Sequence, residues 1–292
     1  MVDSFTTNNH SLLSDKVVAI YGLGLMGSSL GLALQNHCKE LIGIDRDLIS
    51  REYALRHHFV SQTFSKPEGG LEDVDLIVIA TPVITILEII RKLPAWFPGS
   101  PIIIDLGSTK RKIVNAMNSL PSRFEAVGGH PICGKETASI INADPEIYRG
   151  APFVLTRTDR TTSRAIEISE ELVFTIGSNP IWMDAEIHDL WIAATSHVPY
   201  LASIALANAI PNEALRLSGP GLMSSTRLAG SSVQMMTDII QTNKDYIRAQ
   251  LRNFRQNLEI IEQLIETNDM DKLADYLGTG RTKYQEIHED DQ

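Results

Sequence analysis

Cysteine is scarce in this chain. Only Cys38 and Cys133 occur among its 292 residues, too few for the disulfide framework that holds small secreted domains together. So few thiols in a chain of this length are typical of a reducing compartment. We therefore expect a cytoplasmic protein whose fold rests on an apolar core, and a hydrophobic content of 43% is ordinary for such a protein.

An excess of positive charge is also missing. The chain has 26 lysines and arginines against 36 aspartates and glutamates, a net charge of −10. Nucleic acids and anionic membrane surfaces attract basic faces, so we expect neither as a partner. An anionic ligand would have to be held by a few well-placed cations.

Long apolar runs are missing as well. The first 14 residues are polar and lack the apolar centre of a signal peptide, and we expect no run of the roughly 18 apolar residues that cross a membrane. No spacing of histidine, cysteine and carboxylate residues indicates a metal site. At about 100–200 residues per domain, the length allows two domains.

Glycines gather where the first apolar run ends, in the sequence VVAIYGLGLMGSSLG of residues 17–31. A strand over 17–21 would lead into three glycines, of which the first allows a tight turn, the second admits a pyrophosphate, and the third lets the next helix pack closely. The helix amides would face the phosphates. A glycine turn without a nucleotide is the alternative, but strand, glycines and helix in register favour a dinucleotide. The residues predicted to line it are Gly22, Gly24, Leu25, Met26 and Gly27.

A second predicted strand, residues 41–44, ends at Asp45, about 20 residues beyond the glycine motif, where such folds place an acid. The Asp45 carboxylate would accept hydrogen bonds from the adenosine ribose and repel a 2′-phosphate. This favours NAD. Arg46 follows and could bind that phosphate, so NADP is the second candidate cofactor.

Further apolar runs predict strands at 74–80, 101–106, 125–127, 151–156 and 179–183. Helical segments between them indicate a Rossmann-type doubly wound parallel sheet, an α/β fold. Ligands bind such sheets at the carboxyl ends of the strands. Thr81-Pro82, Ser108 and His130 follow three of these strands, so we expect them to share one crevice with the glycine loop.

After Asp184 the strand patterns stop, and the remaining ~110 residues read as helices. Residues 185–209 are apolar on most faces, and Pro199 should kink this helix. From Lys244 to about Glu266, apolar residues at alternating spacings of four and three form a seam for another helix. We expect a flexible N-terminus (1–14), a nucleotide-binding domain (15–184) and an all-helical dimerisation domain (185–292), because these apolar surfaces mark an interface.

His130 is the main candidate for chemistry, in the sequence GGHPICGKE. Histidine titrates near neutrality, so it can take the proton of an alcohol while the same carbon loses hydride. A lone histidine is more often structural, but the carboxyl edge of a nucleotide-binding sheet favours the functional interpretation. Ser108 could hydrogen-bond the substrate alcohol and the nicotinamide amide, or merely cap the next helix.

Cations and a second histidine complete the candidates. Arg227, in GPGLMSSTRLAG, could hold a carboxylate in bidentate fashion or make an ordinary surface ion pair. His197 precedes Pro199 on the apolar helix and could be a core histidine. His188 is a weaker candidate, residues 110–112 (KRK) are most simply a solvated helix start, and Cys133 is expected to be a small buried thiol.

Five motifs in order, GLGLMGSSL, DLGSTK, GGHPICGKE, TSHVPY and SSTRLA, resemble those of the prephenate/arogenate dehydrogenases of tyrosine biosynthesis. The resemblance covers roughly residues 17–287. It implies a nicotinamide-binding domain followed by a helical domain that builds a homodimer, with the active site between them. The implied reaction is the NAD(P)-dependent oxidative decarboxylation of prephenate to 4-hydroxyphenylpyruvate, of arogenate to tyrosine, or of both.

The resemblance also implies residue roles. The catalytic histidine falls on His130, and the serine that binds the hydroxyl falls on Ser108. The carboxylate-binding arginine, the second active-site histidine and the acid after the histidine-proline motif fall on Arg227, His197 and Glu136.

Two positions differ from the pattern of that family. Lys135 stands where a small or neutral residue is common, so it could bear on the choice between keto-acid and amino-acid side chains. Met235-Met236 stands where some members of that family have an aromatic residue that the partner subunit contributes near the substrate ring.

Other functions fit part of the pattern. A β-hydroxyacid dehydrogenase or imine reductase shares the glycine motif and a helical domain, but such enzymes usually rely on a lysine of the helical domain rather than on GGHPICGKE. A nucleotide sensor without turnover would bind NAD(P) and show no substrate-dependent absorbance change.

Overall fold

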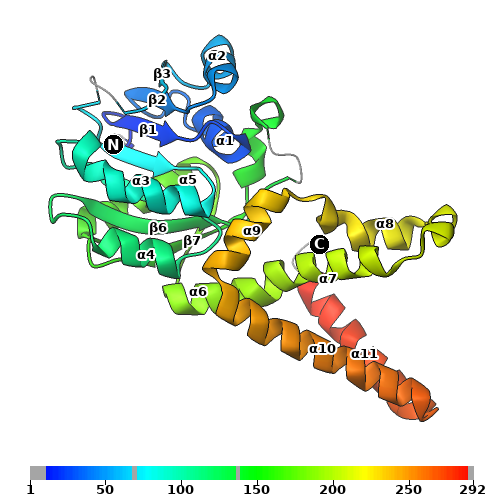
Figure 1. Cartoon of the computed structure of the whole chain (residues 1–292). Helices are drawn as coiled ribbons and strands as arrows, with labels where there is room; N and C mark the ends of the chain where they lie inside the picture. Colours follow the sequence, from blue (N-terminus) through cyan, green and yellow to red (C-terminus); the bar gives the residue numbers. More distant parts are fainter. Residues whose placement is uncertain (1–10, 68–70, 136–138, 289–292) are drawn as a thin grey trace, which may run out of the picture. The chain divides into compact units, whose positions relative to one another are not determined.

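The computed structural model of the chain describes residues 11–67, 71–135 and 139–288. Its centre is one eight-stranded sheet in the order β3-β2-β1-β4-β5-β6-β7-β8 (Figure 1). Neighbouring strands are parallel except β6 and β7, which pair antiparallel. The strands are β1 (Val17–Tyr21), β2 (Glu40–Ile44), β3 (Gln62–Phe64), β4 (Leu76–Ile79), β5 (Ile102–Asp105), β6 (Glu125–Pro131), β7 (Pro152–Arg157) and β8 (Asn179–Trp182).

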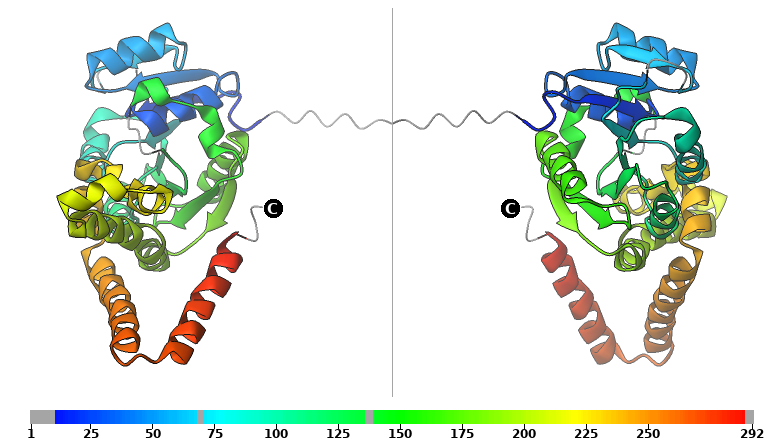
Figure 2. Two further views of the ribbon diagram at one scale, coloured as in Figure 1. Left: turned by 90° about the vertical axis from the view of Figure 1, so that its right-hand side faces the viewer. Right: turned by 90° about the vertical axis from the view of Figure 1, so that its left-hand side faces the viewer.

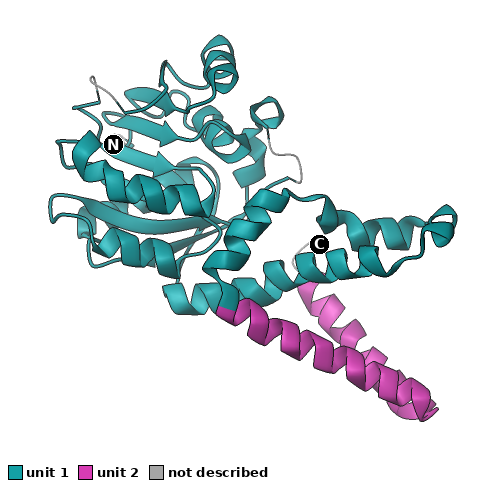
Figure 3. Cartoon of the chain, viewed as in Figure 1, with its two compact units in different colours: residues 1–244 teal, residues 245–292 magenta. Residues whose placement is uncertain are grey.

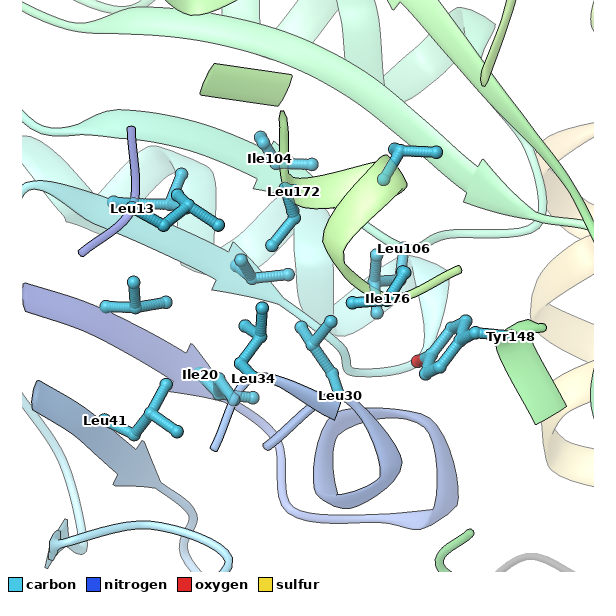
Figure 4. Close-up of a cluster of buried hydrophobic side chains, with 14 of the residues drawn as sticks. Leu13, Ile20, Leu30, Leu34, Leu41, Ile104, Leu106, Tyr148, Leu172 and Ile176 are labelled. Carbon is cyan, nitrogen blue, oxygen red and sulfur yellow. The ribbon is translucent and has the colours of Figure 1, made fainter. Parts of the chain in front are cut away.

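Helices cover both faces of the sheet, so the expected doubly wound α/β architecture is confirmed. One apolar cluster joins α1 and α5 to one face (Figure 4), and a second joins α3 and α4 to the other. Burial of both faces explains the near-continuous apolar sequence of β1, β4 and β5. The helices are α1 (Leu25–Ala33), α2 (Leu48–Arg56), α3 (Val83–Trp96), α4 (Arg111–Asn118) and α5 (Ser163–Thr175).

Strand β6 differs from its prediction. The expected strand ended at residue 127 and released His130 into a turn, but β6 continues to Pro131 because β7 provides an antiparallel partner, with His130 opposite Val154. A Cβ on Gly129 would lie 2.4 Å from the carbonyl oxygen of Asp105. The glycines of GGHP therefore allow close strand packing, and His130 projects from a strand. The short edge strand β3 had no sequence signal.

Helices follow from residue 185 onward, as expected. They are α6 (Ala185–Ile192), a π-helical turn (Ala193–His197), α7 (Val198–Ala209), α8 (Pro220–Thr226) and α9 (Val233–Thr242). Pro199 cannot donate to the carbonyl of Thr195, one turn back. A π-helical turn ends at His197, two residues before this proline, and the predicted kink itself stays a prediction.

Among the described residues, the stretch Ala185–Ala209 is one helix long enough, with an 18-residue window apolar enough, to cross a membrane by length and composition. The expectation that no segment reaches that level is wrong. Such a pattern alone is weak evidence, because core helices share it. Three polar side chains buried within it, His188, Asp189 and His197, belong to the site described below.

The chain forms two compact units, residues 1–244 and 245–292 (Figure 3). The second unit holds most of α10 (Lys244–Glu266) and all of α11 (Met270–His288). Figure 2 shows these helices diverging from the turn between them. The Tyr276 hydroxyl donates a hydrogen bond to Asn257 at 2.6 Å. Many apolar side chains of this hairpin are exposed, among them Leu258, Ile265 and Leu277.

Candidate active site

The glycine loop between β1 and α1 has the form that a dinucleotide requires. Gly22 has φ +102°, and a Cβ there would lie 2.7 Å from the carbonyl oxygen of Ala80. A Cβ on Gly27 would lie 1.9 Å from the carbonyl oxygen of Gly22, whereas one on Gly24 would meet nothing within 4 Å. The fold itself therefore requires glycine at positions 22 and 27, whereas Gly24 borders open space. No side chain caps α1 at Gly24, so the amides of its first turn suit a pyrophosphate.

Asp45 lies beside this loop at the end of β2. Its Oδ2 accepts a hydrogen bond from the amide of Leu23 at 2.7 Å, and its Oδ1 accepts one from the amide of Asp47 at 2.8 Å. These bonds hold the carboxylate next to the loop while leaving lone pairs for ribose hydroxyls. Arg46 is exposed directly beyond it. This arrangement fits an adenosine ribose.

Thr81 follows β4 on the other side of the glycine loop. Its methyl group would lie 2.8 Å from a Cβ on Gly22. Its hydroxyl is buried and has no hydrogen-bond partner among the described residues. A buried polar group without a partner is costly, so a hydroxyl in this place suits a ligand. Pro82 is the N-cap of α3 and adds no side-chain hydrogen bond.

His130 is part of a chain of three buried or half-buried polar groups. Its Nδ1 lies 2.9 Å from Nε2 of His188 on α6. Nδ1 of His188 lies 2.8 Å from Oδ1 of Asp189. Burial, with His188, Lys110 and His197 close by, holds the pKa of His130 well below its usual range. His130 is therefore neutral at neutral pH and able to accept a proton.

Lys110 corrects the prediction of a solvated helix start at 110–112. It is fully buried, forms an ion pair with Asp105 at the end of β5, and donates to the carbonyl of Gly129. Burial lowers its pKa, and Asp105 opposes this. Arg111 donates through its backbone amide and Nε to Oδ2 of Asp189 at 3.0 and 3.3 Å. The signal that was missed is Asp105 itself, an acid ending a fully apolar strand, which requires a buried cation.

His197 lies in the π-helical turn and is almost fully buried. The side-chain amide of Asn243 lies 3.4 Å from its Nδ1 and also donates to the carbonyl of Asp189 at 2.6 Å. Its Nε2 has no partner among the described residues. Burial lowers the pKa of His197 to about 4, and Asp189 opposes this shift. It is a neutral histidine with one ring nitrogen unused, and it lies close enough to His130 to contribute to the lowered pKa of that residue.

The structure places the remaining candidates as follows. Ser108 is half-buried and does not cap α4, whose N-cap is Lys110, so the capping alternative is wrong. Arg227 is exposed after α8, in a segment held against α7 by a 3.0 Å hydrogen bond from Ala229 to Ser203.

The candidates associated with substrate choice lie elsewhere. Lys135 is exposed and forms an ion pair with Asp144 at 2.9 Å. Glu136 lies outside the described residues. Met235 is exposed, and Met236 is buried. No cluster of histidine, cysteine and carboxylate side chains that could hold a metal occurs in the described part of the chain.

A dinucleotide cradle and a neutral histidine at the carboxyl edge of one doubly wound sheet define a nicotinamide-dependent dehydrogenase. Two family models identify which kind: the prephenate dehydrogenase nucleotide-binding domain matches residues 30–181, and the prephenate dehydrogenase dimerization domain matches residues 184–279. The chain belongs to the prephenate dehydrogenase family. The predicted resemblance, fold class and NAD(P) dependence are thereby confirmed, and the other dehydrogenase and sensor interpretations are set aside.

Individual relatives agree with this assignment. Prephenate dehydrogenase of Bacillus subtilis is 29% identical over 274 residues, which is 90% of this chain and 74% of the relative. The structure of Aquifex aeolicus prephenate dehydrogenase with hydroxyphenyl propionate and NAD+ is similar with a TM-score of 0.87 and 28% identity, covering 94% of this chain and 99% of that one. The structure of Synechocystis arogenate dehydrogenase is similar with a TM-score of 0.80 and 25% identity, covering 93% of this chain and 99% of that one.

Proposed function

We propose that this chain oxidises prephenate with NAD and releases carbon dioxide, giving 4-hydroxyphenylpyruvate for tyrosine biosynthesis. Arogenate, which differs in carrying an amino-acid side chain, is the second candidate substrate. Relatives named for both substrates support the reaction class. The observation that carries the proposal is His130, a neutral base at the same sheet edge as the glycine loop.

The chain's residues have three tasks in this reaction. A bound nicotinamide supplies the acceptor for the hydride that leaves the ring carbon bearing the hydroxyl. His130 takes the hydroxyl proton as that carbon is oxidised. The electron pair of the bond to the departing carboxylate enters the ring, and the resulting phenolate oxygen takes the proton back from His130. Because aromatisation drives the reaction, the protein chiefly orients the groups and moves this one proton.

Substrate binding is assigned by family resemblance and supported by placement. Ser108 offers a half-buried hydroxyl after β5, suited to the substrate alcohol. His197 offers an unused ring nitrogen, which as an N–H can donate to a substrate oxygen. Arg227 is proposed to bind a carboxylate, and Glu136 and Lys135 to face the side chain that distinguishes prephenate from arogenate.

NAD is proposed over NADP because the Asp45 carboxylate is held at the ribose position by two backbone amides. Its negative charge would repel a 2′-phosphate there. The cofactor contacts proposed with it are those of Gly22, Gly24, Leu25, Met26, Gly27, Thr81 and Pro82, with Arg46 as the residue that would favour NADP.

The proposed domain boundary is residue 184, with the helical part forming a homodimer. The description of the second family model as a dimerization domain supports this, as do the exposed apolar side chains of α10 and α11. The scarcity of cysteine supports a cytoplasmic location.

The test combines prephenate and arogenate with NAD and NADP, and follows reduced cofactor by its absorbance. We expect the largest kcat/KM for prephenate with NAD. A larger value for arogenate would reverse the substrate assignment, and no turnover in any of the four combinations would defeat the proposed reaction.

A further inference from the structure

We propose that His188 and Asp189 are positioning residues that set the tautomer of His130, leaving its Nε2 unprotonated and available as the base. This inference rests on the proposed function for the meaning of the base, but the arrangement itself is a property of the folded chain. It follows from which groups can donate and which can only accept.

Asp189 is the fixed end of the chain of hydrogen bonds. Its Oδ1 accepts from the amide of Lys110 at 2.7 Å, and its Oδ2 accepts from the amide and Nε of Arg111 at 3.0 and 3.3 Å. Burial raises the pKa of Asp189, but the hydrogen bonds from His188, Lys110 and Arg111 outweigh this and lower that pKa below its usual value. Asp189 is therefore ionised, and an ionised carboxylate can only accept hydrogen bonds.

The protonation of both histidines follows from this. Since Asp189 can only accept, the nitrogen of His188 that faces it at 2.8 Å, Nδ1, must carry a proton. In a neutral imidazole the other nitrogen, Nε2, is then an acceptor. Nδ1 of His130, 2.9 Å away, must donate to it, so Nε2 of His130 is left unprotonated. The ionised Asp189 thus fixes which nitrogen of His188 carries a proton, and His188 in turn fixes which nitrogen of His130 does.

The charges near His130 are compatible with a neutral His130 ring. Besides His188, it faces Lys110 and His197. The positive charge of Lys110 is balanced by its ion pair with Asp105. His197 is uncharged because burial lowers its pKa to about 4. When His130 gains the hydroxyl proton, its Nδ1–H bond to His188 strengthens, because hydrogen bonds from a charged donor are stronger.

A purely structural role is the alternative, since Asp189 also joins the start of α4 to α6. The tautomer of His130 separates the two interpretations. Ring-nitrogen NMR on the uniformly labelled protein should show His130 protonated on Nδ1 and bare on Nε2 at pH 7. In His188→Leu the same ring should lose this preference. A proton on Nε2 of His130 in the unaltered protein would overturn the proposal.

Kinetics supply the second readout. His188→Leu should lower kcat by roughly 10–100-fold, by analogy with the partners that orient metal-bound histidines, with KM changed less than about twofold. His188→Gln, whose carbonyl can accept the same proton from His130, should recover most of that loss. The matched control is His37→Gln, an exposed histidine after α1, which should behave as the unaltered protein.

The outcomes distinguish this proposal from the proposed function. Equal losses in His188→Leu and His188→Gln at unchanged thermal stability would contradict the positioning role. The Nδ1–H tautomer in a protein that oxidises neither prephenate nor arogenate would support the arrangement and refute the reaction. Turnover in a protein whose His130 carries its proton on Nε2 would support the reaction and refute the positioning role.

Discussion

His130 is neutral at neutral pH chiefly because burial lowers its pKa, and the charged side chains near it are held in ion pairs. Lys110 is bound to Asp105, and Asp189 is bound to the first amides of α4 and to Arg111. Removing one member of such a buried set typically costs about 3–5 kcal/mol, because the other charge is left unpaired. The tolerance of the site to substitution should therefore be lowest at Lys110, Asp105 and Asp189, although none of the three needs to touch the substrate.

The pH profile tests the state of His130. Only the neutral ring accepts the proton, so turnover is lost as pH falls through its pKa. Because that pKa is lowered, the acid limb should lie below the ordinary histidine value of about 6.5. His130→Ala should lower kcat by roughly 10²–10⁴-fold and remove the limb while leaving NAD binding intact.

His197→Ala is the comparison for that experiment. It should act mainly on KM and keep the acid limb, because His197 is assigned to binding. Loss of the limb in His197→Ala, with its retention in His130→Ala, would show that the base has been assigned to the wrong histidine.

Asp45 tests the cofactor assignment. Asp45→Ser removes the charge that repels a 2′-phosphate and one acceptor for the ribose, so the ratio of kcat/KM for NAD to that for NADP should fall on the order of tenfold or more. Asp47→Ser is the matched control, because it removes a neighbouring charge and retains a residue able to cap α2. An equal shift in both variants would mean that net charge, and not a ribose contact, sets the preference.

At the scale of the elements, strand β6 is under the tightest constraint. Gly129→Ala would place a Cβ 2.4 Å from the carbonyl oxygen of Asp105, which belongs to the backbone and cannot turn away. Overpacking of this kind costs about 1–3 kcal/mol. The midpoint of thermal unfolding should fall for Gly129→Ala and fall less for Gly128→Ala, where the nearest atom is a side-chain carbon of Thr156 at 3.3 Å. Equal midpoints would contradict this reading of the strand.

Some of the strands and helices could be predicted from the sequence, and others could not. Short apolar runs that end at glycine, aspartate or Thr-Pro placed β1, β2, β4 and β5, and the spacing of apolar residues placed α10, because these signals are local. The extension of β6 depends on pairing with β7, which lies some 20 residues further on, and so has no local signal. For the same reason His130, Ser108 and the glycine motif could be found by sequence, whereas the partners of His130 could not. The sequence made His188 only a weaker candidate and Lys110 a solvated residue, and their partners Asp189 and Asp105 became evident only in the fold.

At the scale of the whole molecule, the prediction is an obligate homodimer. The exposed apolar side chains of α10 and α11 include Phe254, Leu258, Ile265 and Leu277, and isolated soluble chains rarely leave such surface uncovered. Sedimentation should give about twice the chain mass of 32.3 kDa at all concentrations that support activity. Charged substitutions at Leu258 and Leu277 should yield monomers, and a stable, active monomer of the unaltered chain would refute the prediction.

The hydrogen bond from His130 to His188 crosses from the nucleotide-binding sheet to the helical part of the chain. The proposed proton acceptor is thus encoded before residue 184, and its hydrogen-bond partner after it. Substitutions of His188 on α6 should therefore shift the pKa of His130, while the glycine loop and Asp45 are left unchanged. A chimera that joins the first half of one relative to the second half of another would take its nucleotide preference and the effect of Lys110 from the first parent, and the effects of His188 and His197 on the pKa of its histidine from the second.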